Sequence, residues 1–185
     1  NIDGLFIGGG FPETGLEEIS RNTSLLIDIK ENIENGLPAY AECAGLMYLA
    51  RNIQYNAVTL PMAGVIPADV VMHSKPQGRG YVKLEATRAH PWFGNQELKS
   101  LSAHEFHYSS LANLSPDTQF AYWVKRGQGI DGVNDGIIIG NLLANYCHLR
   151  QTDTCDWVDR FVKFIIHCKN TIHDDHHKQE RRRAI

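Results

Sequence analysis

A cysteine between a strand pattern and a helix pattern is the feature that most constrains what this chain can fold into. The segment Tyr40–Met47, with the sequence Tyr-Ala-Glu-Cys-Ala-Gly-Leu-Met, predicts a buried strand that ends at Glu42 and a helix that begins near Ala44. Small residues beside Cys43 let the chain turn sharply at this point. Such a strand–turn–helix resembles the nucleophile elbow of hydrolases, with cysteine in place of serine. A helix N-terminus next to a cysteine also favours the thiolate, which is the nucleophilic form.

The order of the predicted elements around this turn indicates an α/β fold. Leu5–Ile7 is a short apolar run that predicts a buried strand, and apolar residues then repeat at helical spacing over 25–33. Strands that alternate with helices favour a mainly parallel central sheet that is covered on both faces. The middle of the chain predicts added strands that extend the sheet or form antiparallel hairpins beside it. These stretches are Gln54–Leu60, Gly64–Met72, Tyr81–Ala86, Ala103–Ser109 and Gln119–Lys125, followed by a buried strand at Ile137–Ile139 and a terminal helix around Trp157–Ile166.

Composition and charge place the chain among ordinary globular domains. Its 185 residues, 43% hydrophobic and 21% charged, predict one domain over residues 1–169 and a polar C-terminal tail at 170–185. A formal net charge of −3 gives no basic field, so we expect neither nucleic acid nor a membrane as a partner. The sequence shows no signal peptide and no apolar run long enough to span a bilayer, which predicts a cytoplasmic protein with reduced cysteines. Because it opens without methionine, directly at a strand pattern, we interpret it as a piece of a longer polypeptide.

Two further segments supply what a cysteine nucleophile needs. Gly8-Gly9-Gly10 follows the first predicted strand and could present backbone N–H groups near the same edge of the sheet. His148 follows the last predicted strand, so Cys43 and His148 would both stand at strand ends, as the members of a Cys–His nucleophilic pair do. The glycine run leads into neither a P-loop nor a dinucleotide fingerprint, so it predicts no nucleotide site. Each of the two residues, taken alone, is also consistent with a purely structural role in the core.

Four motifs in a fixed order give the chain a specific resemblance to a known family. They are Gly8-Gly9-Gly10-Phe11-Pro12-Glu13, the segment Ala41–Leu49, His104-Glu105-Phe106-His107-Tyr108-Ser109 and the segment Leu143–Leu149, with Gly80-Tyr81 between the second and the third. Over residues 3–166 the chain resembles the glutamine amidotransferase domain of cobyrinic acid a,c-diamide synthases, within the class I, triad-type glutaminases. The resemblance implies the class I glutamine amidotransferase-like (flavodoxin-like) α/β sandwich.

This resemblance implies a role for each matching residue. Cys43 would attack the side-chain amide of glutamine, and His148 would take the thiol proton and later activate water. The backbone N–H groups of Gly10 and Ala44 would form the oxyanion hole. The substrate-binding residues would be Gly9, His104, Glu105, Phe106, His107, Tyr108 and Ser109.

The resemblance also implies what lies outside this chain. An upstream synthetase domain would use ATP and Mg²⁺ to activate a tetrapyrrole carboxylate, which ammonia from glutamine then amidates in cobalamin biosynthesis. The present domain is expected to need no cofactor and no metal. His104 and His107 could suggest a metal site, but residues three apart on a strand point to opposite faces. The sequence leaves open whether the chain forms a homodimer.

Two residues depart from the family pattern. Class I glutaminases usually carry a glutamate two residues after the catalytic histidine, where this chain has Arg150, so we expect a Cys–His pair without an orienting carboxylate. The residue after the nucleophile is usually glycine and here is Ala44, which is compatible with the turn unless that position needs a positive φ.

Three other functions stay open on the sequence. The runs Lys75–Tyr81 and Arg126–Gly132 resemble the sirohaem amidase subgroup, which is linked to dissimilatory sulfur metabolism. Ala44 and Arg150 are compatible with a catalytically silent glutaminase-like module that only binds and positions its synthetase domain. A cysteine hydrolase of another specificity would share the nucleophile but would not require the motif of residues 104–109.

Overall fold

The computed structural model describes residues 2–93, 100–152 and 155–183, with side chains described as far as residue 171. The strands form an eight-stranded sheet in the order β1-β2-β11-β10-β9-β6-β7-β12 and a four-stranded sheet in the order β4-β3-β5-β8. The large sheet contains β1 (Leu5–Ile7), β2 (Ala39–Glu42), β6 (Gly78–Ala86), β7 (Leu101–His107), β9 (Gln119–Arg126), β10 (Asn134–Ile139), β11 (Leu142–Asn145) and β12 (His148–Leu149). The small sheet contains β3 (Ala50–Tyr55), β4 (Val58–Pro61), β5 (Ile66–Met72) and β8 (Ser109–Ala112). The predicted strands are thus found, and the stretches 54–60 and 103–109 each cover parts of two strands.

Parallel pairing is confined to one side of the large sheet. β2 lies between β1 and β11 and runs parallel to both, whereas the other neighbouring pairs of this sheet are antiparallel. The sheet is therefore less parallel than the alternation of strands and helices in the first part of the chain predicts. The reason is that β9, β10 and β11 follow one another through short connections, and a parallel crossover needs a long one.

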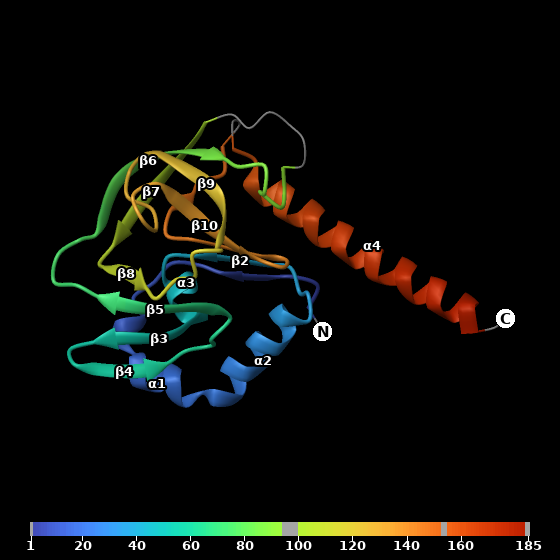
Figure 1. Ribbon diagram of the computed structural model, residues 1–185, viewed down its shortest axis with the longest axis horizontal. Coiled ribbons are helices and arrows are strands. Elements are labelled where there is room, and N and C mark those ends of the chain that lie inside the picture. The colour runs from blue at the N-terminus through green and yellow to red at the C-terminus, as the bar shows by residue number, and fades with distance from the viewer. Residues whose placement is uncertain (1, 94–99, 153–154, 184–185) are drawn as a thin grey trace.

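Helices cover both faces of the large sheet (Figure 1). They are α1 (Leu16–Arg21), α2 (Thr23–Glu34), α3 (Ala44–Leu49) and α4 (Trp157–Arg183), with a short 3-10 helix, η1 (Pro12–Thr14), before α1. One apolar cluster joins α3 and the small sheet to one face of the large sheet, and it includes Ala39 and Ala41 of β2. Tyr40 points the other way, into a second cluster that contains Trp92 and, from α4, Phe161. Because both of its faces are covered, β2 is buried along its whole length.

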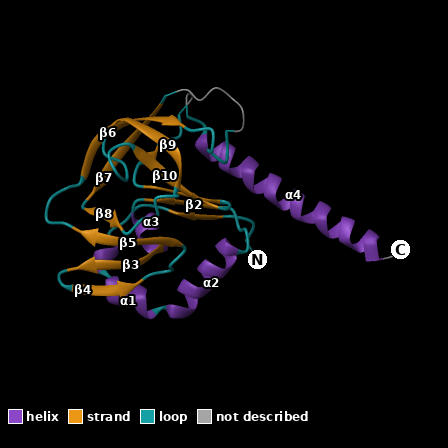
Figure 2. Ribbon diagram, in the orientation of Figure 1, coloured by secondary structure: helices purple, strands orange, loops and turns teal. Residues whose placement is uncertain are grey.

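The last helix continues past the predicted end of the domain at residue 169. Figure 2 shows α4 as one continuous helix that extends away from the two sheets. Its backbone is helical to Arg183, because residues 170–183 contain neither glycine nor proline to stop a helix. Within the described ranges, neither α4 nor any other helix combines the length and the apolar character that a membrane span requires.

Candidate active site

Cys43 occupies the turn between β2 and α3, as the sequence predicts. Its backbone has φ 49° and ψ −99°, a conformation that L-residues rarely adopt and that clusters at functional sites. The amide of Cys43 donates to the carbonyl oxygen of Asn145 at 2.7 Å, which ties the turn to β11. Gly45 lets α3 start this close to the sheet, because a Cβ there would lie 2.2 Å from the carbonyl oxygen of Ile7. Close packing of α3 on β1 therefore holds the strained turn in place.

His148 reaches the turn through the curl of the large sheet. The chain leaves β11 beside β2 at Asn145 and re-enters the same sheet at its far edge, where β12 pairs with β7. The two crossing residues, Tyr146 and Cys147, donate their amides to the buried carboxylate of Asp135 at 3.0 and 2.9 Å. The histidine therefore stands on a two-residue edge strand, and not at the exit of the strand that the sequence predicts as the last one.

The structure brings Cys43 and His148 together. Hydrogen bonding to Cys43 and then to Glu42 raises the pKa of His148 from its ordinary value of 6.5 to about 10, against the lowering effect of burial. At neutral pH the ring of His148 is therefore in its protonated, positively charged form. Cys43 is 6% exposed, and its Sγ lies 4.0 Å from the carbonyl oxygen of Phe106 on β7. The two residues form a compact, mostly buried pair at the meeting point of β2, β7 and β12.

A carboxylate lies on the other side of the imidazole. Oε2 of Glu42 is 3.3 Å from Nδ1 of His148, while Oε1 accepts hydrogen bonds from the Leu149 amide at 2.8 Å and the Tyr40 hydroxyl at 2.5 Å. The expectation that no carboxylate contacts the histidine is wrong. Arg150 is exposed, and the carboxylate comes from Glu42, the residue before Cys43. The available signal was a charged residue inside a buried strand pattern, since a buried carboxylate needs partners.

The glycine run after β1 packs against His148 and against Ala44, the residue that follows Cys43. A Cβ on Gly9 would lie 2.6 Å from Cε1 of His148, so glycine is what leaves the imidazole in place. A Cβ on Gly10 would lie 3.7 Å from the Cβ of Ala44, which puts the two predicted oxyanion-hole residues side by side. Ala44 begins α3 and is not among the residues with positive φ, so its methyl group causes no backbone strain.

The predicted substrate motif on β7 divides between two faces of the sheet. His104 and Phe106 point outward, and His104 lies directly across from His148 in the pairing of β7 with β12. Glu105 and His107 point into the interior, at 2% and 3% exposure. His104 and His107 therefore lie on opposite faces, as the period of a strand predicts. The outward residues are the ones that share a face with the candidate base.

The buried residues of this motif hydrogen-bond to neighbouring backbone and side chains, and they do not line the cavity that borders His148. Glu105 accepts hydrogen bonds from two backbone amides in the loop after β9, at 2.8 and 2.9 Å. His107 stacks on Tyr146 with ring centroids 4.1 Å apart, and its Nδ1 donates to the carbonyl oxygen of Ser109 at 2.9 Å. The hydroxyl of Ser109 donates to the hydroxyl of Tyr146 at 3.0 Å. His107 and Ser109 thus contact Tyr146, which precedes His148 by two residues, whereas Glu105 supports the loop after β9. Their role in substrate binding stays a prediction.

A cavity of about 680 Å³ borders His148 on the outer side of β7. It is lined by Tyr81, Ser102, Ala103, His104, His148, Leu149, Arg150 and Thr152. Of the predicted substrate residues, His104 lines this cavity. Phe106 and Tyr108 pack edge-on against each other, with ring centroids 5.5 Å apart, and do not line it.

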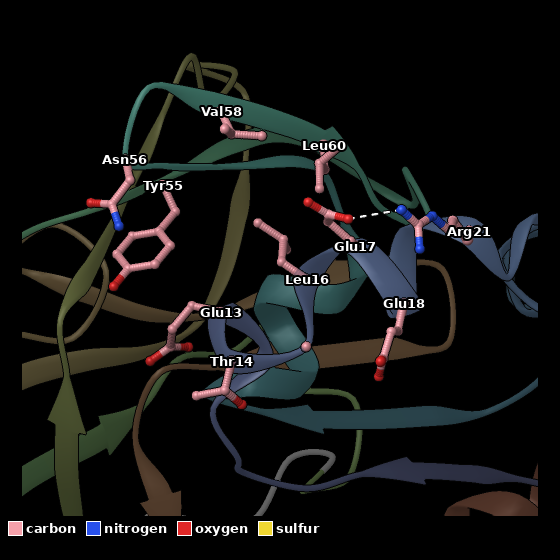
Figure 3. A pocket seen from close by; sticks show the side chains of 11 residues that line it. Glu13, Thr14, Leu16, Glu17, Glu18, Arg21, Tyr55, Asn56, Val58 and Leu60 are labelled. Atoms are coloured by element: carbon pink, nitrogen blue, oxygen red, sulfur yellow. Dashed lines mark hydrogen bonds and ion pairs between the residues drawn. The ribbon is translucent and has the colours of Figure 1, made fainter.

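A second cleft, of about 390 Å³, lies between α1 and the β3–β4 hairpin, as Figure 3 shows. Its acidic side chains are Glu13, Glu17 and Glu18, and Glu17 pairs with Arg21 at 2.8 Å. Neither member of the Cys–His pair lines this cleft, so it is separate from the candidate site. Among the residues that the structure describes, no three metal-binding side chains come together.

Comparisons with known proteins agree with the sequence motifs. Residues 1–153 match the family described as CobB/CobQ-like glutamine amidotransferase domain. Cobyrinate a,c-diamide synthase of Magnetococcus marinus is 42% identical over 164 residues, which cover 88% of this chain and 34% of that protein. The protein of the same name from Methanosphaera stadtmanae is 39% identical over 164 residues, which cover 88% of this chain and 35% of that protein.

A solved structure described as "Crystal structure of glutamine amidotransferase" superposes on the chain with a TM-score of 0.63. The two are 18% identical, and the match covers 89% of this chain and 79% of that one. This likeness confirms the α/β fold class that the sequence predicts. The chain spans about a third of the length of the curated relatives it matches.

Proposed function

This chain belongs to the CobB/CobQ-like glutamine amidotransferase domain family, and from that premise we propose that it hydrolyses glutamine through Cys43 and His148 to supply ammonia. The observation that carries the proposal is the strained turn that presents Cys43 to His148, with Gly9 against the imidazole and Gly10 beside Ala44. Acyl transfer needs a nucleophile, a base and an oxyanion site close together, and these residues can supply all of them.

In the first half-reaction the sulfur of Cys43 attacks the side-chain amide carbon of glutamine. Negative charge moves onto the amide oxygen, where the backbone N–H groups of Gly10 and Ala44 would stabilise it. The carbon–nitrogen bond then breaks as His148 gives the departing nitrogen the proton that came from the thiol. Ammonia leaves, and a γ-glutamyl thioester remains on Cys43.

Water completes the cycle in the second half-reaction. His148 removes a proton as water attacks the thioester carbon, the carbon–sulfur bond breaks, and the sulfur regains its proton. The sum consumes one glutamine and one water and gives one glutamate and one ammonia. Next to the free sulfur of Cys43 the pKa of His148 is about 10, so the ring is protonated at neutral pH and can protonate the departing nitrogen. Acylation of the sulfur removes this first cause of the raised pKa, and the ring, which has given up its proton, can then accept one from water.

The ammonia would be used outside this chain. The curated relatives are named cobyrinate a,c-diamide synthases and extend well beyond the matched region. We therefore infer an upstream synthetase domain that uses ATP to amidate carboxylates of cobyrinate. The absence of a P-loop from this sequence is consistent with that division of labour. A sirohaem acceptor stays a prediction from the sequence, and no contact among the described residues favours it.

Two structural observations support an active site over a silent binding module. Ala44 takes the first helical position without a positive φ, so the missing glycine costs the turn nothing. Arg150 leaves the histidine without its usual glutamate, but Glu42 contacts His148 from another strand. Neither departure from the family pattern therefore removes a part that the reaction needs.

Glutamine hydrolysis by matched cysteine variants tests the proposal. Ammonia and glutamate are measured for the wild-type chain, for Cys43→Ser and for Cys168→Ser, whose thiol is buried on α4. We expect Cys43→Ser to lose hydrolysis by about 10³-fold or more and Cys168→Ser to keep it. In a polypeptide that also carries the synthetase domain, Cys43→Ser should still amidate its acceptor with free ammonia. A folded Cys43→Ser chain that hydrolyses glutamine normally would disprove the assignment.

A further inference from the structure

Glu42 directly precedes Cys43 in the sequence and contacts His148. The reaction described above gives it no role. We propose that Glu42 is the positioning carboxylate of this site, which holds His148 toward Cys43 in place of the missing glutamate at position 150. The inference rests on the proposed glutamine hydrolysis and adds a residue to it.

The contact between Glu42 and His148 is built into the fold, because the carboxylate is itself fixed. Glu42 is 6% exposed, and its Oε1 accepts hydrogen bonds from the Tyr40 hydroxyl and the Leu149 amide. The Tyr40 hydroxyl in turn accepts a hydrogen bond from the side-chain amide of Asn145 at 3.0 Å. Rotation of the carboxylate would leave a buried amide and a buried hydroxyl unpaired, at a cost of about 1–3 kcal/mol each. Oε2 therefore stays directed at Nδ1 of His148.

The same side chain joins two parts of the sheet that are not neighbours in its strand order. β2 pairs with β11, where Glu42 stands opposite Asn145, whereas β12 lies at the far edge and pairs with β7. The hydrogen bond from the Leu149 amide to Glu42 connects β12 to the end of β2. The distance between His148 and Cys43 is therefore set by the side chain adjacent to Cys43 in the sequence.

The geometry selects one tautomer of the imidazole. An ionised carboxylate only accepts hydrogen bonds, so Nδ1 of His148 carries a proton and donates it toward Glu42. Nε2 is then the nitrogen that exchanges a proton with the sulfur of Cys43. In a nucleophile–histidine–carboxylate triad the carboxylate acts in this way, by fixing the tautomer and stabilising the imidazolium without taking its proton.

The other ionisable groups around His148 cannot take over this role. His104 faces it across the β7–β12 pair, and Arg150 follows two residues later and lines the same cavity. Both groups are neutral or positive. Cys43 is the remaining partner, on the nucleophile side of the ring. Among the described side chains that contact or face the imidazole, Glu42 is thus the single carboxylate.

The variant Glu42→Gln tests the proposal directly. Glutamine keeps the size of the side chain and an acceptor for Leu149, but its amide nitrogen would face Nδ1 and favour the wrong tautomer. We expect kcat for glutamine hydrolysis to fall by about 10²–10⁴-fold with a smaller change in KM. We also expect the pKa of His148, measured by NMR titration, to fall by about one unit or more. The alkaline limb of the kcat–pH profile should move to lower pH by the same amount.

Two further variants separate positioning from a general effect on the fold. Glu105→Gln changes another buried carboxylate, which accepts hydrogen bonds from two backbone amides and does not contact His148. This variant should leave the pKa of His148 unchanged. Glu42→Asp keeps the charge but withdraws the carboxylate by one methylene, and it should give an intermediate kcat and an intermediate pKa of His148. It also decides the question if Glu42→Gln does not fold, with folding judged by circular dichroism and thermal unfolding.

The proposal is overturned if a folded Glu42→Gln chain keeps the wild-type kcat. It is also overturned if kcat falls while the pKa of His148 and the pH profile stay unchanged, because a purely structural role would give that result. A wild-type chain without glutaminase activity would contradict the proposed function instead. In that case the NMR titration of His148 in the wild-type and variant chains still decides whether Glu42 positions the imidazole.

Discussion

The turn after β2 and the strand β7 both border the candidate site, but they present their side chains in opposite ways. At the turn, Glu42, Cys43 and Ala44 are consecutive, and all three reach the site because the backbone reverses direction at a positive φ. On β7 successive side chains alternate, so His104 faces the site and Glu105 faces the interior. A strained turn can therefore concentrate chemistry in one short segment. A strand of the same length divides its residues between the site and the structure that supports it.

Two histidines face each other across β7 and β12, and replacing each in turn should give the largest difference in kcat. His148→Asn removes the proposed base next to the turn, and we expect kcat for glutamine hydrolysis to fall by about 10²–10⁴-fold. His104→Asn changes the outer face of β7 and should lower kcat less than about tenfold, with most of its effect on KM. Steady-state kinetics of both variants decide the matter. A larger loss of kcat in His104→Asn would move the base from β12 to β7.

The division of β7 into two faces predicts a difference in stability between neighbouring residues. Glu105→Ala leaves two backbone amides without their acceptor in the interior, and we expect the free energy of unfolding to fall by about 2–4 kcal/mol. His104→Ala changes an exposed side chain and should alter that free energy by about 0.5 kcal/mol or less. Urea denaturation measures both values. Equal losses would show that the motif acts as one unit, without separate faces.

The glycine run predicts a smaller effect, on activity more than on stability. In Gly9→Ala the new methyl group would meet the ring of His148, so we expect a loss of about tenfold in kcat from a displaced base. Gly10→Ala is the matched control, since its methyl group would meet Ala44 at an ordinary contact distance and should cost less. Activity and thermal unfolding are compared for the two variants. Equal losses of kcat in the two variants would show that the close approach of Gly9 to the ring of His148 is unimportant for activity.

The smallest expected effect is a change of stability with pH. The pKa of His148 in the folded chain is about 10, above its ordinary value of 6.5. Its stabilising contribution is therefore complete below pH 6.5 and is lost as the pH rises through 10. The free energy of unfolding should decline between pH 7 and 10, and it should decline less in His148→Asn. Parallel pH curves for the wild-type and variant chains would contradict the raised pKa of His148.

The turn at Cys43 was predictable because it depends on neighbouring residues. Small side chains around Cys43, a strand pattern before it and a helix pattern after it specify the turn without reference to the rest of the chain. The glycine run followed from similar local rules. His148 was a candidate because it follows a predicted strand, and the resemblance to a family gave it the role of base. The crossing between strands that brings it to Cys43 could not be predicted from local sequence.

The role of Glu42 and the division of β7 depend on contacts between distant segments. Glu42 meets His148 because the sheet curls until β12 approaches the end of β2, and no local pattern shows that closure. The alternation of β7 was available from the period of a strand, but which face is buried depends on packing against Tyr146 and the loop after β9. Residues quoted together as one motif, such as His104 and His107, can therefore have separate functions.

We propose that the turn after β2 presents Cys43 as the nucleophile for a glutamine side chain. The most direct measurement is the mass of the intact chain, followed by peptide mapping, after incubation with a diazoketone analogue of glutamine. We predict a single adduct on Cys43 that excess glutamine suppresses and that forms much more slowly in His148→Asn. Modification of another cysteine, or no modification of a folded wild-type chain, would contradict the claim.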